Sequence, residues 1–131
     1  SPENLGQIGW GGSTARLGAL PAGGSGERWY AVTYAASGVS YHPHVYLAEG
    51  GAYYVFDVYR NASVGARYCP SATRPTQRTD GVVNWEVNPP FTDAECPAGE
   101  KPEPGQTILI RVRPLSINAT CQSYSIIFVN G

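Results

Sequence analysis

The chain is divided into short runs of aromatic and β-branched residues, and glycine- and proline-rich turns separate these runs. Residues of these types favour strands, and no segment keeps a helical period over three turns. The runs lie at residues 15–20, 28–34, 44–48, 52–59, 82–87, 108–113 and 124–128. We therefore expect one all-β domain over residues 1–131. Its expected architecture is a jelly-roll-like β-sandwich of about seven to nine strands without significant helix.

Alternation within the runs predicts the place of some strands. Both faces of the run at 52–59 are largely apolar, so we expect it in the centre of its sheet. The runs at 108–113 and 124–128 resemble the two strands of a hairpin. In the first of these two runs, Arg111 and Arg113 are expected to face solvent, while the alternate residues Ile108, Ile110 and Val112 face the core.

Charge is sparse in this sequence. Charged residues make up 15% of the chain, where about 25% is ordinary, and the net charge is −1. Basic residues do not form a patch, and Lys101 is the single lysine. Because a phosphate backbone attracts clustered basic residues, we expect no nucleic-acid partner. No apolar stretch reaches the roughly 18 residues that a bilayer span requires, so we expect no membrane span.

Cysteine content and the first residues indicate export. The chain begins without a methionine and contains three cysteines, so we interpret it as a mature chain after signal-peptide removal, located extracellularly or at the cell surface. Cys69 and Cys96 flank a long polar connection and form the preferred disulfide. Cys121 is then either a buried thiol or the site of a bond to another chain. Asn61 and Asn118 begin sequons that permit glycosylation.

No arrangement of catalytic residues is evident. His42 and His44 are the only histidines, and because a zinc site needs three or four ligands we expect no metal there. The sequence contains no nucleophile elbow of the G-x-S-x-G type. Glycoside hydrolysis needs two carboxylates about 5–9 Å apart, and nothing in the sequence brings Asp57 and Glu86 together. We therefore expect that the protein is not an enzyme.

A surplus of tyrosine suggests a binding surface. The chain has nine tyrosines, and the alternations above do not place all of them in a core. Exposed aromatic rings on a sheet can stack on sugars or pack against protein. The alternative is that they cover the edges of the sandwich. The residues expected on the binding surface are Tyr30, Tyr34, Tyr53, Tyr59 and Trp85.

One family shows several of these motifs in the same order. Residues 27–32, with the sequence ERWYAV, resemble the strand entry of the pre-peptidase C-terminal domain of secreted bacterial proteins. Further similar stretches are HPHVYL at 42–47, FDVY at 56–59, NWEV at 84–87, IRV at 110–112 and CQSYSI at 121–126. Together these matches extend from about Leu17 to Val129.

The resemblance implies a jelly-roll-like sandwich that is a non-catalytic accessory of an exported protease or other hydrolase. Some members bind protein fibres or polysaccharide, and some bind calcium through acidic residues. Glu3, Asn4 and Glu27 stand at the corresponding positions. The family's paired aspartates are missing and Arg28 follows Glu27, while calcium takes six to eight oxygens. We therefore expect no cofactor and keep calcium as the single candidate.

Two functions fit these observations. The first is a secreted, non-catalytic structural subunit that assembles with copies of itself into an extracellular fibre or surface layer. Residues 1–20 would then be exchanged with a neighbouring subunit, because an open sheet edge accepts an added strand. The alternative is an accessory binding module of a secreted hydrolase that recognises polysaccharide or fibrous protein. The first function is the leading expectation.

Overall fold

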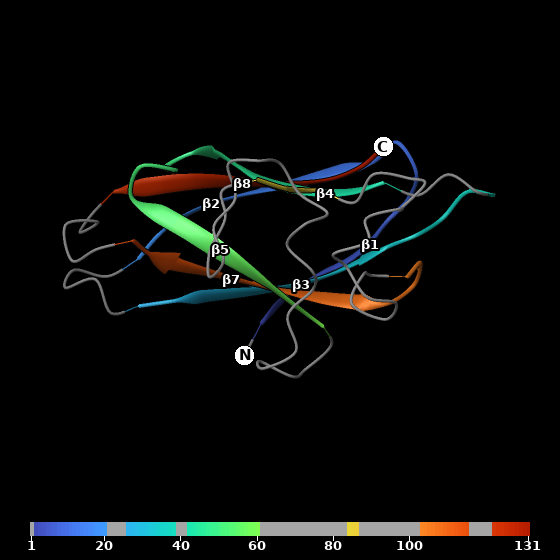
Figure 1. Ribbon diagram of the computed structural model, residues 1–131, viewed down its shortest axis with the longest axis horizontal. Coiled ribbons are helices and arrows are strands. Elements are labelled where there is room, and N and C mark those ends of the chain that lie inside the picture. The colour runs from blue at the N-terminus through green and yellow to red at the C-terminus, as the bar shows by residue number, and fades with distance from the viewer. Residues whose placement is uncertain (1, 21–25, 39–41, 61–83, 87–102, 116–121) are drawn as a thin grey trace, which may run out of the picture.

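The computed structural model describes residues 2–20, 26–38, 42–60, 84–86, 103–115 and 122–131. Two four-stranded sheets pack face to face in these ranges, and no helix occurs in them (Figure 1). The strands are β1 (Glu3–Ile8), β2 (Ser13–Ala19), β3 (Arg28–Tyr34), β4 (Pro43–Glu49), β5 (Tyr54–Arg60), β6 (Asn84–Glu86), β7 (Thr107–Pro114) and β8 (Ser123–Asn130). The expected all-β, single-domain sandwich is confirmed.

Consecutive strands belong to opposite sheets. The first sheet has the order β1-β3-β7-β5 and the second the order β2-β8-β4-β6. The expectation that the last two strands form a hairpin is therefore wrong. β7 pairs with β3 and β5, whereas β8 pairs with β2 and β4. β7 and β8 each have one buried apolar face, and these two faces meet across the core because the strands lie in opposing sheets.

The place of β5 also differs from the expectation. Among the described strands it is the last of the first sheet, where we expected a central strand. Its sequence is apolar on both faces because both faces are buried. Phe56 lies in the core, and Val55 and Tyr59 on the opposite face are also buried. Because both faces of β5 are buried, its sequence can be apolar on both faces although β5 has a described neighbouring strand on one side only.

The N-terminal residues form two strands of the domain. β2 contains most of the strand expected at 15–20, whereas β1 has no strong strand signal in the sequence. β1 runs parallel to β3 of the same chain, and its register shifts between Asn4 and Gln7. Gly6 lies in this shift with φ 74°. Residues 3–8 thus occupy the edge of their own sheet, and exchange with a neighbouring subunit stays a prediction.

Tyrosines of the first sheet are bonded across the core to the second layer. Their hydroxyl groups reach acceptors on the opposite side of the sandwich, which satisfies a polar group inside an apolar core. These contacts are Tyr30 with the hydroxyl of Tyr124 (2.7 Å), Tyr34 with the carbonyl of His44 (3.1 Å) and Tyr54 with the carbonyl of Gln122 (2.5 Å). Burial, together with the bond to Tyr30, raises the pKa of Tyr124 above its ordinary value.

The prediction of an aromatic binding surface is wrong for most of its residues, because they are buried. Four of its five members are buried, each at most 2% exposed: Tyr30, Tyr34, Tyr59 and Trp85. Tyr53 alone is exposed, at 40%. These residues were expected outside because the alternation within the runs does not place all nine tyrosines in a core. The sequence does not show that the opposite sheet supplies partners for the tyrosine hydroxyl groups.

Removal of one buried hydroxyl tests this interpretation. We expect Tyr30→Phe to lower the free energy of unfolding by about 1–3 kcal/mol, because the Tyr124 hydroxyl would stay buried without this partner. Tyr53→Phe is the matched control and should change stability by less than about 0.5 kcal/mol, since Tyr53 is exposed. Urea unfolding measures both values. Equal effects of the two substitutions would contradict the role of Tyr30.

Candidate functional site

Strand pairing gathers charged and aromatic side chains on the outer face of the first sheet. Arg111 of β7 lies opposite Trp29 of β3 on one side and opposite Asp57 of β5 on the other. Their sequence neighbours Tyr30, Ile110 and Phe56 belong to the core, so alternation points these three side chains away from it. Three distant segments of the sequence therefore meet in one row across the sheet.

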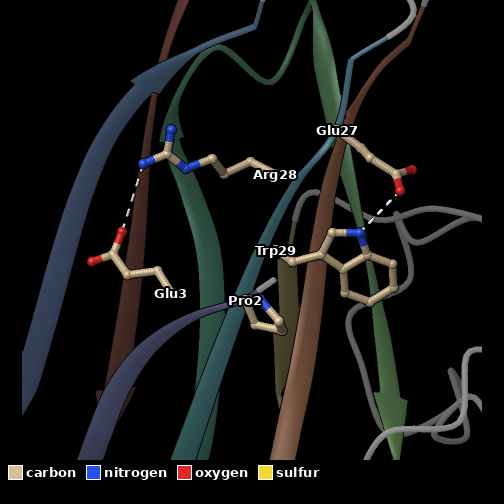
Figure 2. Close-up of a pocket in the computed structure, with 5 residues that line it drawn as sticks. All are labelled: Pro2, Glu3, Glu27, Arg28 and Trp29. Carbon is tan, nitrogen blue, oxygen red and sulfur yellow. Dashed lines mark hydrogen bonds and ion pairs between the residues drawn. The ribbon is translucent and has the colours of Figure 1, made fainter.

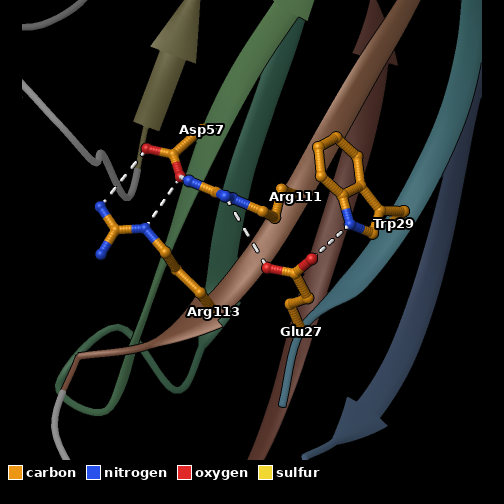
Figure 3. Close-up of polar contacts among 5 residues, drawn as sticks. All are labelled: Glu27, Trp29, Asp57, Arg111 and Arg113. Atoms are coloured by element: carbon orange, nitrogen blue, oxygen red, sulfur yellow. Dashed lines mark hydrogen bonds and ion pairs between the residues drawn. The ribbon is translucent and has the colours of Figure 1, made fainter. Parts of the chain in front are cut away.

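The carboxylate of Asp57 binds two arginines (Figure 3). Arg111 donates from Nη2 to Asp57 Oδ2 at 2.8 Å, and Arg113 donates from Nε to the same oxygen at 2.8 Å. The Asp57 side chain is 1% exposed. A buried charge is tolerated when it is paired and hydrogen-bonded in this way.

Arg111 also connects Asp57 to two aromatic rings. Its guanidinium carbon lies 5.7 Å from the centroid of the Trp29 ring and 5.3 Å from that of Tyr59. These distances suit cation–π attraction. Glu27 completes the group, because its carboxylate accepts the indole N–H of Trp29 at 3.0 Å and lies 3.7 Å from Arg111. We call Glu27, Trp29, Asp57, Arg111 and Arg113 the Asp57 cluster.

An open groove borders the Asp57 cluster and shares two residues with it. The groove has a volume of about 530 Å³ and is lined by Pro2, Glu3, Glu27, Arg28 and Trp29 (Figure 2). Parallel pairing of β1 with β3 creates it, since this pairing sets Glu3 opposite Tyr30 at the beginning of both strands. We call it the Trp29 groove.

Charges of both signs surround the Trp29 groove. Glu3 accepts a hydrogen bond from Nε of Arg16 at 2.5 Å, and Arg28 lies 3.7 Å from its other oxygen. The bond from Arg16 holds the pKa of Glu3 below its ordinary value. Glu3 is therefore anionic at neutral pH. The groove thus combines an indole and a proline ring with carboxylate and guanidinium groups.

The lining of the groove offers aromatic, apolar and charged contacts. Its five residues include two carboxylates, those of Glu3 and Glu27, and no hydroxyl, thiol or imidazole. Asp57 and Glu86 lie on the outer faces of opposite sheets, so these two carboxylates do not form a pair. Each is bonded to a basic side chain, Asp57 to Arg111 and Glu86 to His42.

The calcium candidates are only partly brought together. Glu3 and Glu27 line the same groove, but both carboxylates lie close to arginines. Asn4 uses its side-chain oxygen to accept the N–H of Gly6. Within the described ranges, no group of three or more acidic, histidine or cysteine side chains is placed to hold a metal ion. Calcium stays a candidate that the family resemblance implies, beside the expectation of no cofactor.

The two histidines bond within the second sheet. Nε2 of His42 lies 2.5 Å from Oε1 of Glu86, and Nε2 of His44 lies 2.6 Å from Oδ1 of Asn84. The two rings are stacked, with centroids 6.5 Å apart. These contacts tie β6 and the residue before β4 to the sheet, as expected of structural histidines.

Several predicted features lie outside the described residues. They are the disulfide between Cys69 and Cys96, the thiol of Cys121 and the sequons at Asn61 and Asn118. These stay predictions. In the described part of the chain, no helix is both long and apolar enough to cross a membrane.

Sequence reasoning did not find the Trp29 groove or the Asp57 cluster. Two signals were present. Arg111 and Arg113 have the spacing of neighbours on one strand face, and residues 27–32 carry the family resemblance. Neither signal reveals that Asp57, more than fifty residues before Arg111, supplies the shared carboxylate.

The fold and the groove together define a β-sandwich with an open groove of mixed charge beside its first sheet. In its structure, the chain is similar to PliG of Aeromonas hydrophila, a periplasmic lysozyme inhibitor of g-type lysozyme, with a TM-score of 0.53 and 15% sequence identity over the full length of both chains. A second similar structure is the pre-peptidase C-terminal domain of collagenase from Bacillus anthracis. That similarity covers all of this chain and 97% of the other, with a TM-score of 0.46 and 12% identity.

No family model matches the sequence, and no curated protein matches it either. The similarity to PliG shows a shared fold. The collagenase domain belongs to the family that the sequence resembles.

Proposed function

We propose that this chain is a non-catalytic binding module of an exported protein and that it docks onto a protein partner through the Trp29 groove. The observation that carries this proposal is the composition of the groove. An indole and a proline ring lie among carboxylate and guanidinium groups on an open surface. Aromatic residues and arginine are the side chains that protein interfaces favour most.

A protein partner has more support than a polysaccharide. A face of exposed aromatic rings was expected to bind either sugars or protein, and four of the five rings named for it are buried. The solved protein PliG is described as an inhibitor of a lysozyme, so a sandwich of this fold serves protein recognition there. Its periplasmic location and the three cysteines of this chain support an extracellular or periplasmic place.

The fibre subunit has less support than the binding module. Its joint was expected at the N-terminal segment, and β1 pairs with β3 of its own chain. Attachment to a hydrolase, as in the family that the sequence resembles, is compatible with the proposed module and is part of the proposal.

A binding panel tests the proposed function. The purified chain is applied to immobilised g-type lysozyme and fibrillar collagen, and to insoluble chitin and cellulose. We expect saturable binding to at least one of the two proteins and none to the polysaccharides. Arg28→Glu should weaken that binding at least tenfold, about 1.4 kcal/mol, because the substitution reverses an exposed charge in the groove.

Leu115→Glu is the matched control for Arg28→Glu. Leu115 is exposed and lies outside the groove, so the substitution should leave affinity within about twofold. Binding to chitin or cellulose without binding to either protein would contradict the proposal. An equal loss in both variants would show that the contact lies outside the groove.

A further inference from the structure

The edge of the second sheet presents a regular strand with an uncharged outward face. β2 pairs with β8 through seven consecutive residues without a register shift, and among the described strands it has no partner on its other side. Its outward side chains are all exposed: Ser13, Ala15, Leu17 and Ala19. Leu17 in the middle of the strand is 80% exposed, the highest value among the large apolar residues described.

Protein sheets usually protect such an edge. The common devices are a proline, a bulge, an outward lysine, an inward-pointing charge or a very short strand, and of these β2 has only an inward-pointing charge. Its one charged residue is Arg16, on the inner face of the strand. This guanidinium is compensated within the chain, because it donates to Glu3 at 2.5 Å and to the carbonyl of Ala15 at 2.9 Å. The charge of Arg16 therefore does little to repel an approaching strand.

We propose that β2 pairs antiparallel with β2 of a second copy of this chain, around a twofold axis at Leu17. Such a pair extends the second sheet across two molecules, as strand addition does in other assemblies. An interface with twofold symmetry needs only one surface that is complementary to itself. β2 satisfies this requirement in the register centred on Leu17.

In that register, Leu17 lies opposite Leu17 of the partner subunit, and Ala15 lies opposite Ala19 of the partner subunit. Arg16 then lies opposite Gly18 of the partner subunit, where no side chain competes for space. The ideal Cβ position of Gly18 lies 2.5 Å from the Tyr124 hydroxyl, so this position is reserved for glycine. A twofold axis at Arg16 would instead set two like charges opposite each other, which is unfavourable.

A second copy of β2 is favoured over an unrelated strand as the partner, because β2 is complementary to itself. The same seven residues supply the apolar contact at the centre, small residues on both sides of it, and a glycine opposite each compensated arginine. Leu17 is not among the residues that line the Trp29 groove. Association at β2 and binding at the groove can therefore be measured separately.

The test is the mass of the purified chain in solution over concentrations from micromolar to millimolar, by sedimentation equilibrium. We expect a shift from the mass of one chain, 14.0 kDa, to that of two chains. Leu17→Lys should raise the dissociation constant of the dimer at least tenfold. Leu115→Lys, which places the same charge at another exposed leucine, should leave it unchanged.

A cross-link tests the register. In a Leu17→Cys variant, oxidation should join the introduced thiols of two chains, since directly opposed residues in a β-ladder lie within reach of a disulfide. Peptide mapping distinguishes this link from bonds to the native cysteines. A monomer at every concentration, or a dimer that Leu17→Lys does not weaken, overturns the proposal. Binding of the Leu17→Lys variant to the lysozyme and collagen of the binding panel tests separately whether the Trp29 groove binds a protein partner.

Discussion

Replacement of Asp57 by alanine should lower the free energy of unfolding by about 3 kcal/mol or more. The Asp57 carboxylate is 1% exposed and accepts hydrogen bonds from Arg111 and Arg113. Without it, two largely buried guanidinium groups lose their shared counter-charge. Arg111 would retain Glu27 at 3.7 Å, which limits the loss. Urea or thermal unfolding, followed by circular dichroism, measures the effect.

A second acidic residue of the same cluster supplies the control. Glu27→Gln removes a carboxylate that also contacts Arg111, but the Glu27 side chain is 48% exposed. Water screens this pair, so we expect a loss below about 1 kcal/mol. Asp57→Asn separates charge from shape, because it keeps the volume and removes the charge. Similar stability of Asp57→Ala and Glu27→Gln would show that the buried carboxylate does not organise the outer face of the first sheet.

Replacement of Asn130 by alanine should have the second large effect, about 2–5 kcal/mol. The Asn130 side chain is fully buried at the end of β8. Its amide nitrogen donates to the carbonyls of Ile8 and Ala35 at 3.0 and 2.6 Å, and its oxygen accepts the N–H of His42 at 3.1 Å. One side chain therefore holds the ends of β1 and β3 to the second sheet.

The direction of these bonds allows a strict test. Asn130→Asp has nearly the same shape but faces two carbonyls with an oxygen, so we expect it to be at least as destabilising as Asn130→Ala. Asn4→Asp is the exposed control and should change stability by less than about 0.5 kcal/mol. A stable Asn130→Asp protein would show that the donor bonds to Ile8 and Ala35 contribute little.

Local sequence was sufficient to locate most of the strands and their buried faces. β3, β4, β7 and β8 lie where runs of aromatic and β-branched residues predict them, and Ile110 and Tyr124 face the core as alternation indicates. The sequence did not predict β1, because its glycine and polar residues have no strand preference of their own. It becomes a strand by pairing with β3.

The candidate site was less accessible to prediction. Glu3 and Glu27 were singled out through the family resemblance as calcium ligands, and they do line one groove. Arg16 and Arg111, which lie beside these carboxylates, belong to other strands. The tyrosines were expected outside because alternation does not place all of them in a core. The acceptors that allow Tyr30 and Tyr34 to be buried lie in the opposite sheet.

Alternation and residue type by themselves determined that this chain forms a sandwich of short strands, because these properties act within a few neighbouring residues. Which strands share a sheet, and which charges meet, was decided by tertiary structure. β7 and β8 follow each other in sequence yet lie in different sheets, and Asp57 reaches Arg113 only through the register of β5 with β7. Such contacts depend on pairing between distant segments, which no local pattern encodes.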